Sequence, residues 1–173
     1  AQLAVRVTRR NRLSDFFIFK EEITMQHTPI KSLLRGSFQG GETVTVCGWA
    51  KTVRDSKNIG FIELSDGSCF SSLQVVFEAQ KLENYKEIAK AGVGTSLRVK
   101  GVVVLTPDAK QPLEINAGSV EVLGTCPSDY PLQKKRHTVE FLRTMPHLRA
   151  RTNTFSAAFR VRSAAAYAIH KFF

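Results

Sequence analysis

The sequence predicts an all-β barrel of five strands with one short helix. Two observations predict it: apolar and polar residues alternate over several stretches between about residues 42 and 123, and one stretch of helical spacing separates the third strand from the fourth. The 173 residues, 43% of them apolar, can bury the core of one domain of about 100 to 150 residues. An SH3-like barrel or a plain five-stranded sheet would show a similar pattern.

The most informative alternation lies in NIGFIELSDG, within the run TVTVCGWAKTVRDSKNIGFIELSDG that holds the first two predicted strands. It places Ile62 and Leu64 on one face of a strand, and Phe61 and Glu63 on the other. A solitary outward aromatic side chain needs a reason. The pattern therefore indicates a polar and aromatic face opposite the apolar one.

The third predicted strand, in SSLQVVFE, points Gln74 to the same face as Phe61. Asp66-Gly67 is the turn signal that joins it to the strand before. Its inward residues are Leu73, Val75 and Phe77.

A short helix and two more strands complete the pattern. KLENYKEIAKAG has apolar residues at helical spacing and a stop at Gly92. SLRVKGVVVL and LEINAGSVEV then alternate, which leaves Glu114 outward and also turns Arg98 and Lys100 to a solvated face. Three strands, a helix and two strands are the order of an OB-fold, a Greek-key barrel whose middle strands bind oligonucleotides or oligosaccharides.

The formal charge of +10 is unevenly distributed along the chain. Residues 25–130 carry 11 Lys and Arg against 11 Asp and Glu, whereas residues 131–173 carry 9 basic residues against one acid. The barrel would therefore recognise nucleic acid by stacking and hydrogen bonds to bases, with few phosphate contacts. The alternative is that Phe61 is covered by the Arg54 loop or the chain terminus and belongs to the core.

Other functional classes find little support in the sequence. Apolar runs are shorter than the roughly 20 residues that cross a bilayer. The three cysteines are far apart, without a CxxC pair or histidines at zinc-ligand spacing, and are expected to be reduced thiols in a cytoplasmic protein. We expect no catalytic residue and no metal ligand in this chain.

Several blocks resemble a known family. VCGWAKTVRDSKNIGFIELSDG, LQVVFE, LRVKG and LEI resemble the anticodon-binding OB domain of the class II aminoacyl-tRNA synthetases for aspartate, asparagine and lysine. YPLQKKRH, EFLR, HLRARTN and FRVRS closely resemble the hinge and opening helix of bacterial-type asparaginyl-tRNA synthetases. The resemblance covers about residues 25–173.

The resemblance implies roles for four residues in binding the tRNA anticodon. Phe61 would stack on the central uridine, Gln74 and Glu114 would hydrogen-bond the same base, and Arg54 would contact the anticodon loop. For Arg54 the alternative is that it caps the loop or forms an ion pair with Asp55 or Asp66. Trp49 is expected in the barrel core rather than against a base.

The resemblance also implies a division of the chain. Residues 1–24 would be an out-of-family or disordered extension, with a transit remnant or an extra helix as alternatives. Residues 25–126 would form the OB domain and residues 127–154 the hinge. Residues 155–173 would be the truncated first helix of the α/β catalytic domain, in motif 1 at the dimer interface, with Phe155, Phe159, Ala166 and Ile169 as its apolar stripe.

The implied activity is ATP-dependent asparagine–tRNA ligation. The whole enzyme would use ATP and Mg²⁺, bind asparagine and tRNA(Asn), and form a homodimer. Motifs 2 and 3 are not found in this sequence, so we expect no activity from this chain alone. The alternatives are a fragment of an aspartyl-tRNA synthetase and a free-standing OB module that binds single-stranded nucleic acid.

Overall fold

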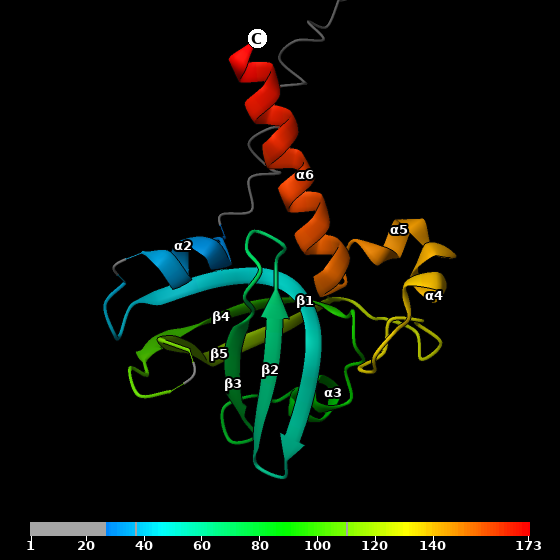
Figure 1. Ribbon diagram of the computed structural model, residues 1–173. Helices are drawn as coiled ribbons and strands as arrows, with labels where there is room; N and C mark the ends of the chain where they lie inside the picture. Colours follow the sequence, from blue (N-terminus) through cyan, green and yellow to red (C-terminus); the bar gives the residue numbers. More distant parts are fainter. Residues whose placement is uncertain (1–26, 37, 110) are drawn as a thin grey trace, which may run out of the picture.

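Four antiparallel pairings and one parallel pairing close the central strands into a barrel (Figure 1). The computed structural model describes residues 27–36, 38–109 and 111–173, so the prediction for residues 1–24 lies outside the described residues. The strands run in the order β1-β2-β3-β5-β4, with β1 paired back to β4. They are β1 (Thr43–Ser56), β2 (Ile59–Ser65), β3 (Leu73–Glu78), β4 (Ser96–Leu105) and β5 (Leu113–Gly124). The five-stranded barrel predicted from the alternation is confirmed.

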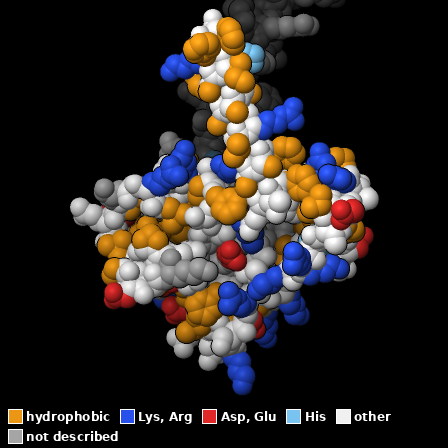
Figure 2. Space-filling view, in the orientation of Figure 1, with side chains coloured by type: hydrophobic (Ala, Val, Ile, Leu, Met, Phe, Trp, Pro, Cys, Tyr) orange, Lys and Arg blue, Asp and Glu red, His pale blue; other side chains and the backbone are white. Residues whose placement is uncertain are grey.

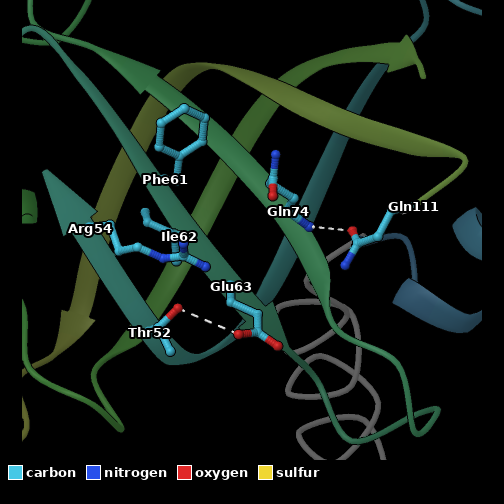
Figure 3. A pocket seen from close by; sticks show the side chains of 7 residues that line it. All are labelled: Thr52, Arg54, Phe61, Ile62, Glu63, Gln74 and Gln111. Atoms are coloured by element: carbon cyan, nitrogen blue, oxygen red, sulfur yellow. Dashed lines mark hydrogen bonds between the residues drawn. The ribbon is translucent and has the colours of Figure 1, made fainter. Parts of the chain in front are cut away.

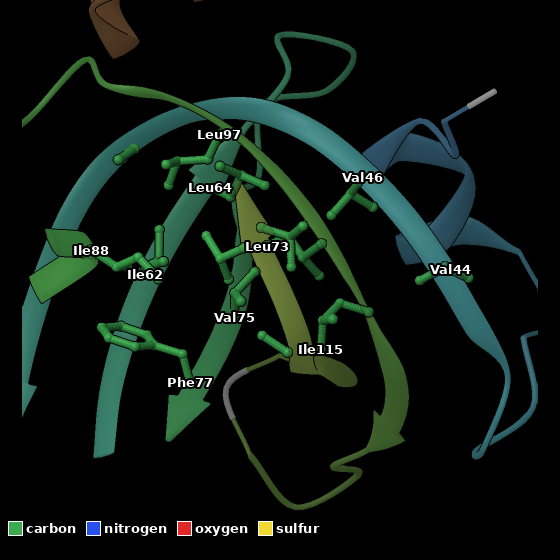
Figure 4. Close-up of a cluster of buried hydrophobic side chains, with 14 of the residues drawn as sticks. Val44, Val46, Ile62, Leu64, Leu73, Val75, Phe77, Ile88, Leu97 and Ile115 are labelled. Atoms are coloured by element: carbon green, nitrogen blue, oxygen red, sulfur yellow. The ribbon is translucent and has the colours of Figure 1, made fainter. Parts of the chain in front are cut away.

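The barrel interior is filled by the residues that the alternation pointed inward (Figure 4). Burial alternates strictly along β3, and the inward side chains of β2 are completely buried. Phe77 is the largest fully buried side chain, and Gly60 is its cross-strand partner. A Cβ added at Gly60 would lie 2.0 Å from Phe77 Cζ, so glycine is required there by the close approach of the ring.

A break in register lies within β1 and changes which side chains face out. Before the break, Val44, Val46 and Ala50 point into the core. The pairing with β2 shifts between Ala50 and Thr52, which leaves Lys51 as an extra residue. A β-bulge of this kind re-aims the following side chains. Beyond it Val53 packs on the core, whereas Arg54 turns outward beside its cross-strand partner Phe61.

A short helix, α2 (Ile30–Arg35), closes one end of the barrel and was not predicted. Ile30 and Leu33 are fully buried in the barrel core. The N-terminus of α2 is capped from the loop after β2: Asp66 Oδ2 accepts from Ile30 N at 2.8 Å, and Ser68 Oγ accepts from Lys31 N at 3.0 Å. Asp66-Gly67 therefore lies in a seven-residue connection between β2 and β3, and side chains of this connection cap α2.

Hydrogen bonds to the Asp66 carboxylate determine its pKa. Partial burial would raise the pKa of this group, but donation from the Ser68 hydroxyl and from the backbone N–H groups of Ile30 and Ser68 lowers it below the ordinary value of 3.8. The carboxylate form is thus the form that the fold stabilises.

The predicted helix between the third and fourth strands is present but shorter. It is α3 (Tyr85–Ala89), and Leu82 lies before it in a turn, still buried in the core. The Tyr85 hydroxyl donates to Asp55 Oδ1, and this bond raises the pKa of Tyr85 to about 12. The tip of the β1–β2 hairpin is thereby tied to α3.

The segment after the barrel has a small core of its own. It contains α4 (Val139–Arg143), α5 (Pro146–Arg149) and the long α6 (Asn153–Phe172). Leu132, Leu142 and Met145 are buried together, with Phe155 packed against them. Thr152 precedes α6, but its hydroxyl donates to Arg149 O at 2.6 Å instead of capping the helix.

Most of α6 projects away from the barrel (Figure 1), and its apolar side chains lie open along its length (Figure 2). Val161, Tyr167, Ile169, Phe172 and Phe173 are exposed. Near its beginning, Arg160 Nη2 donates to Gly67 O in the loop after β2. In the described part of the chain, none of the helices has the length and apolar character needed to cross a membrane.

Candidate nucleic-acid interface

A hollow lies on the outer face of the barrel, over β1, β2 and β3 (Figure 3). The strand pairing explains which side chains meet there. Arg54 is paired with Phe61 across β1 and β2, and Glu63 is paired with Gln74 across β2 and β3. Its lining residues are Thr52, Arg54, Phe61, Ile62, Glu63, Gln74 and Gln111.

Phe61 is the aromatic side chain of this face and keeps 38% of its surface exposed. The neighbouring residues Gly60 and Ile62 point inward, so the strand alternation forces Phe61 outward. The alternative that placed Phe61 in the core is therefore wrong. An exposed ring beside a cation and hydrogen-bonding groups can stack on a flat, polar ring.

Gln74 and Glu114 lie together, as their shared outward direction predicted. Gln74 Nε2 donates to Glu114 Oε2 at 2.9 Å, across β3 and β5. The two strands run parallel and pair at Val75 with Ile115 and at Val76 with Asn116, which places Gln74 beside Glu114 one residue earlier. Both groups are half-buried, so their hydrogen bond is partly shielded from water.

Arg54 has its guanidinium on the hollow and no ion pair with any residue that the structure describes. The alternative partners of Arg54 are engaged elsewhere. Asp55 accepts from the Tyr85 hydroxyl, and Asp66 accepts from Ile30 N and Ser68. Arg54 is therefore a cation available to an anionic or carbonyl-bearing ligand.

Two of the remaining polar residues of the hollow were not selected from the sequence. Thr52 Oγ1 donates to Glu63 Oε2 at 3.4 Å, and Gln111 Oε1 accepts from Gln74 N at 3.0 Å. Gln111 lies in the loop between β4 and β5, where no periodicity could assign its direction. Thr52 is turned outward by the bulge. Glu63 was placed on this face by alternation, but no role was assigned to it.

The expectation that Trp49 lies in the core is wrong. Its side chain is 44% exposed, because it alternates with the inward residues Val46 and Ala50. The Arg151 guanidinium carbon lies 5.4 Å from the centre of its ring, a cation–π contact between the barrel and the segment that follows. Arg98 forms a surface ion pair with Glu121 at 2.7 Å, as a solvated face predicts.

The described residues form neither a metal site nor a disulfide bond. No group of three or more His, Cys, Asp or Glu residues among them could hold a metal ion. Cys47, Cys69 and Cys126 are free thiols.

Comparison with known proteins identifies the barrel. Residues 44–123 match the tRNA anti-codon family model, described as an OB-fold nucleic acid binding domain. The closed barrel of five strands agrees with that match, so this part of the chain has the OB-fold.

A longer stretch of the chain, 150 residues, has more specific relatives. It is 57% identical over 150 residues to the asparagine–tRNA ligase of Bacillus cereus, and 58% identical over 150 residues to that of Acetivibrio thermocellus. The chain is thus a homologue of asparagine–tRNA ligases. In both matches 86% of this chain aligns with 32% of the ligase, so the chain spans about a third of the length of these relatives.

Solved structures agree on the fold. The asparaginyl-tRNA synthetase of Pyrococcus horikoshii, determined with asparaginyl-adenylate, superposes with a TM-score of 0.74 at 21% identity. The match covers 86% of this chain and 34% of that chain. At this identity the likeness speaks for the fold alone.

Proposed function

We propose that this chain is the anticodon-binding part of an asparagine–tRNA ligase and that it reads the central uridine of the tRNA(Asn) anticodon. The observation that carries the proposal is the hollow over β1, β2 and β3, in a chain homologous to asparagine–tRNA ligases. It is lined by an exposed aromatic ring, a cation and the amide of Gln74, which is hydrogen-bonded to Glu114 on the neighbouring strand.

In this proposal the uracil ring stacks on Phe61, and Gln74 and Glu114 meet its edge. A carboxylate can only accept hydrogen bonds, whereas an amide both donates and accepts. Uracil offers its ring N–H to such acceptors. Neutral cytosine has no proton on that nitrogen, so it would turn one acceptor toward another, at a cost of about 1 to 3 kcal/mol.

Arg54 would supply positive charge for tRNA binding on a barrel that has no net charge. Residues 25–130 are electrically neutral in total, so phosphate attraction would come from a few cations. Arg54 lies beside Phe61 and has no ion-pair partner in the described part of the chain. It would contact the anticodon loop at the stacked base.

The reaction of the whole protein follows from the family. It would join asparagine to tRNA(Asn) with ATP and Mg²⁺, in the cytoplasm, as a homodimer. The described residues do not fit a metal site, so no step through ATP or Mg²⁺ is assigned to them. The exposed apolar stripe of α6 is consistent with a dimer-forming first helix of a catalytic domain after a hinge at residues 127–154.

A binding titration of the full chain tests the proposal. Two anticodon stem-loops are compared at one physiological salt concentration, one with the anticodon GUU and one with its central U replaced by C. We expect the GUU stem-loop to bind at least about tenfold more tightly, which corresponds to about 1.4 kcal/mol.

Equal binding of the two stem-loops would contradict the proposal. Affinity that depends on salt and on strand length, but not on the central base, would instead identify a general single-strand binder. A preference for stem-loops with the anticodon of tRNA(Asp) over GUU would favour the aspartate enzyme.

A further inference from the structure

The amide of Gln111, in the loop between β4 and β5, is held in one orientation by the fold (Figure 3). Thr106 Oγ1 donates to Gln111 O at 2.9 Å, and Gln74 N donates to Gln111 Oε1 at 3.0 Å. An amide nitrogen cannot accept a hydrogen bond, so Oε1 must face Gln74. Nε2 is then left on the hollow, without a hydrogen-bond partner among the residues that the structure describes.

The amide of Gln74 is fixed by the same reasoning. Its Nε2 donates to Glu114 Oε2 at 2.9 Å, and an ionised carboxylate only accepts. The oxygen Oε1 is therefore the atom that Gln74 keeps for a ligand. One glutamine thus offers an acceptor to the hollow, and the other offers a donor.

The order of the strands arranges these groups across the sheet. Arg54 lies on β1, Gln74 on β3, and Gln111 comes just before β5, which is the neighbour of β3. From Gln111 through Gln74 to Arg54 the hollow presents a donor, an acceptor and a donor. The pairing edge of uracil presents the complement: a carbonyl oxygen, a ring N–H and a second carbonyl oxygen. Cytosine replaces the first two by an amino group and a bare ring nitrogen, which reverses both.

We infer that Gln111 determines specificity for uridine by donating from Nε2 to the carbonyl oxygen that cytosine replaces with an amino group, on the base that stacks on Phe61. The inference rests on the proposed function and deepens it. Gln74 Oε1, with Glu114 beside it, would accept from the ring N–H, and Arg54 would donate to the other carbonyl oxygen of this base. Gln111 then acts both on the loop, through Oε1, and on the base, through Nε2.

The variant Gln111→Glu separates these two tasks. A carboxylate has nearly the same shape and still accepts from Gln74 N, but it cannot donate to a carbonyl oxygen. It can accept from the amino group of cytosine. The Gln111→Glu variant of the 173-residue chain is titrated with the GUU stem-loop and its central-C counterpart, and the ratio of the two affinities is compared with that of the unmodified chain.

Gln80→Glu is the matched control for the added charge. Gln80 is exposed beyond the end of β3 and does not line the hollow. We expect Gln80→Glu to keep the preference for uridine and Gln111→Glu to lose it by about tenfold, with a similar melting temperature for both variants. Gln111→Met, which removes donor and acceptor together, should lose the preference as well, and it replaces Gln111→Glu if that variant does not fold.

The outcomes distinguish this inference from the proposed function. If the unmodified chain prefers uridine and Gln111→Glu or Gln111→Met keeps the same ratio, Gln111 only holds the loop and the inference is overturned alone. If the unmodified chain binds both stem-loops equally, the proposed function fails and the inference fails with it.

Discussion

The two faces of β2 carry alternate residues of one strand and serve different purposes. Ile62 and Leu64 are completely buried in the barrel core, whereas Phe61 and Glu63 line the outer hollow. The inner face is uniform in chemistry, and the outer face combines a ring, charges and amides. The residue types on the inner face are therefore explained by packing in the core. Those on the outer face are explained by binding to a ligand.

Truncation on the inner face should cost the most. Ile62→Ala should lower the free energy of unfolding by about 2 to 5 kcal/mol, because it removes a fully buried side chain and leaves a cavity. Phe61→Ala, one residue away on the outer face, should lower it by about 1 kcal/mol or less. Urea titrations of both variants check the contrast. Equal losses would mean that Phe61 belongs to the core.

A methyl group on the inner face should cost somewhat less. Gly60→Ala would place its Cβ 2.0 Å from Phe77 Cζ, so the ring has to move and the free energy of unfolding should fall by about 1 to 3 kcal/mol. Gly118→Ala is the matched control, since its Cβ would meet nothing closer than Lys100 O at 3.8 Å. Thermal unfolding that gave the two variants the same melting temperature would contradict the packing argument.

The loop at the end of β2 should have the smallest effect, and one that depends on pH. The pKa of Asp66 is lowered in the folded protein, so its contribution to stability is present above the ordinary pKa of 3.8 and is lost as the pH falls through the folded value. Asp66→Asn removes the charge and one of the two accepting oxygens, so it should cost about 1 kcal/mol at neutral pH.

The difference between Asp66→Asn and the unmodified chain should shrink on acidification below about pH 4. Unfolding curves measured between pH 7 and pH 2.5 would show this convergence. A constant difference across that range would mean that the hydrogen bonds to Ile30 and Ser68 do not depend on the charge of Asp66.

Alternation made most of the barrel predictable. It assigned the inward residues of β2 and β3 correctly and turned Phe61, Gln74 and Glu114 outward, because a strand in a barrel has one dry face and one wet face. The position of Glu114 next to Gln74 depends on the parallel pairing of β3 with β5, which the strand order of the fold supplies.

The features that were missed depend on contacts that alternation does not encode. The bulge at Lys51 inserts one residue without any special residue type, and it decides the direction of Arg54. Helix α2 is capped by a residue 36 positions away in the sequence. Trp49 is the exception: its residue type favours the core, but alternation counted from Val46 places it outside.

The direction of Gln111 could not be read from the sequence either. It lies in a loop, where side chains follow no period, and its orientation is fixed by hydrogen bonds to Thr106 and Gln74. The site could thus be predicted where it lies on regular strands, and could not be predicted where the bulge in β1 or a loop completes it.

On this account, the outer face of the barrel recognises the base. The most direct test is the affinity of the Phe61→Ala variant of the 173-residue chain for the two stem-loops that differ only in the central base. The account predicts that binding of the GUU stem-loop falls by about tenfold to a hundredfold, since stacking on an aromatic ring is worth about 1 to 3 kcal/mol per base. It also predicts that the preference for uridine over cytidine largely disappears. A variant that stays folded and keeps both its affinity and its preference would show that Phe61 does not hold the base.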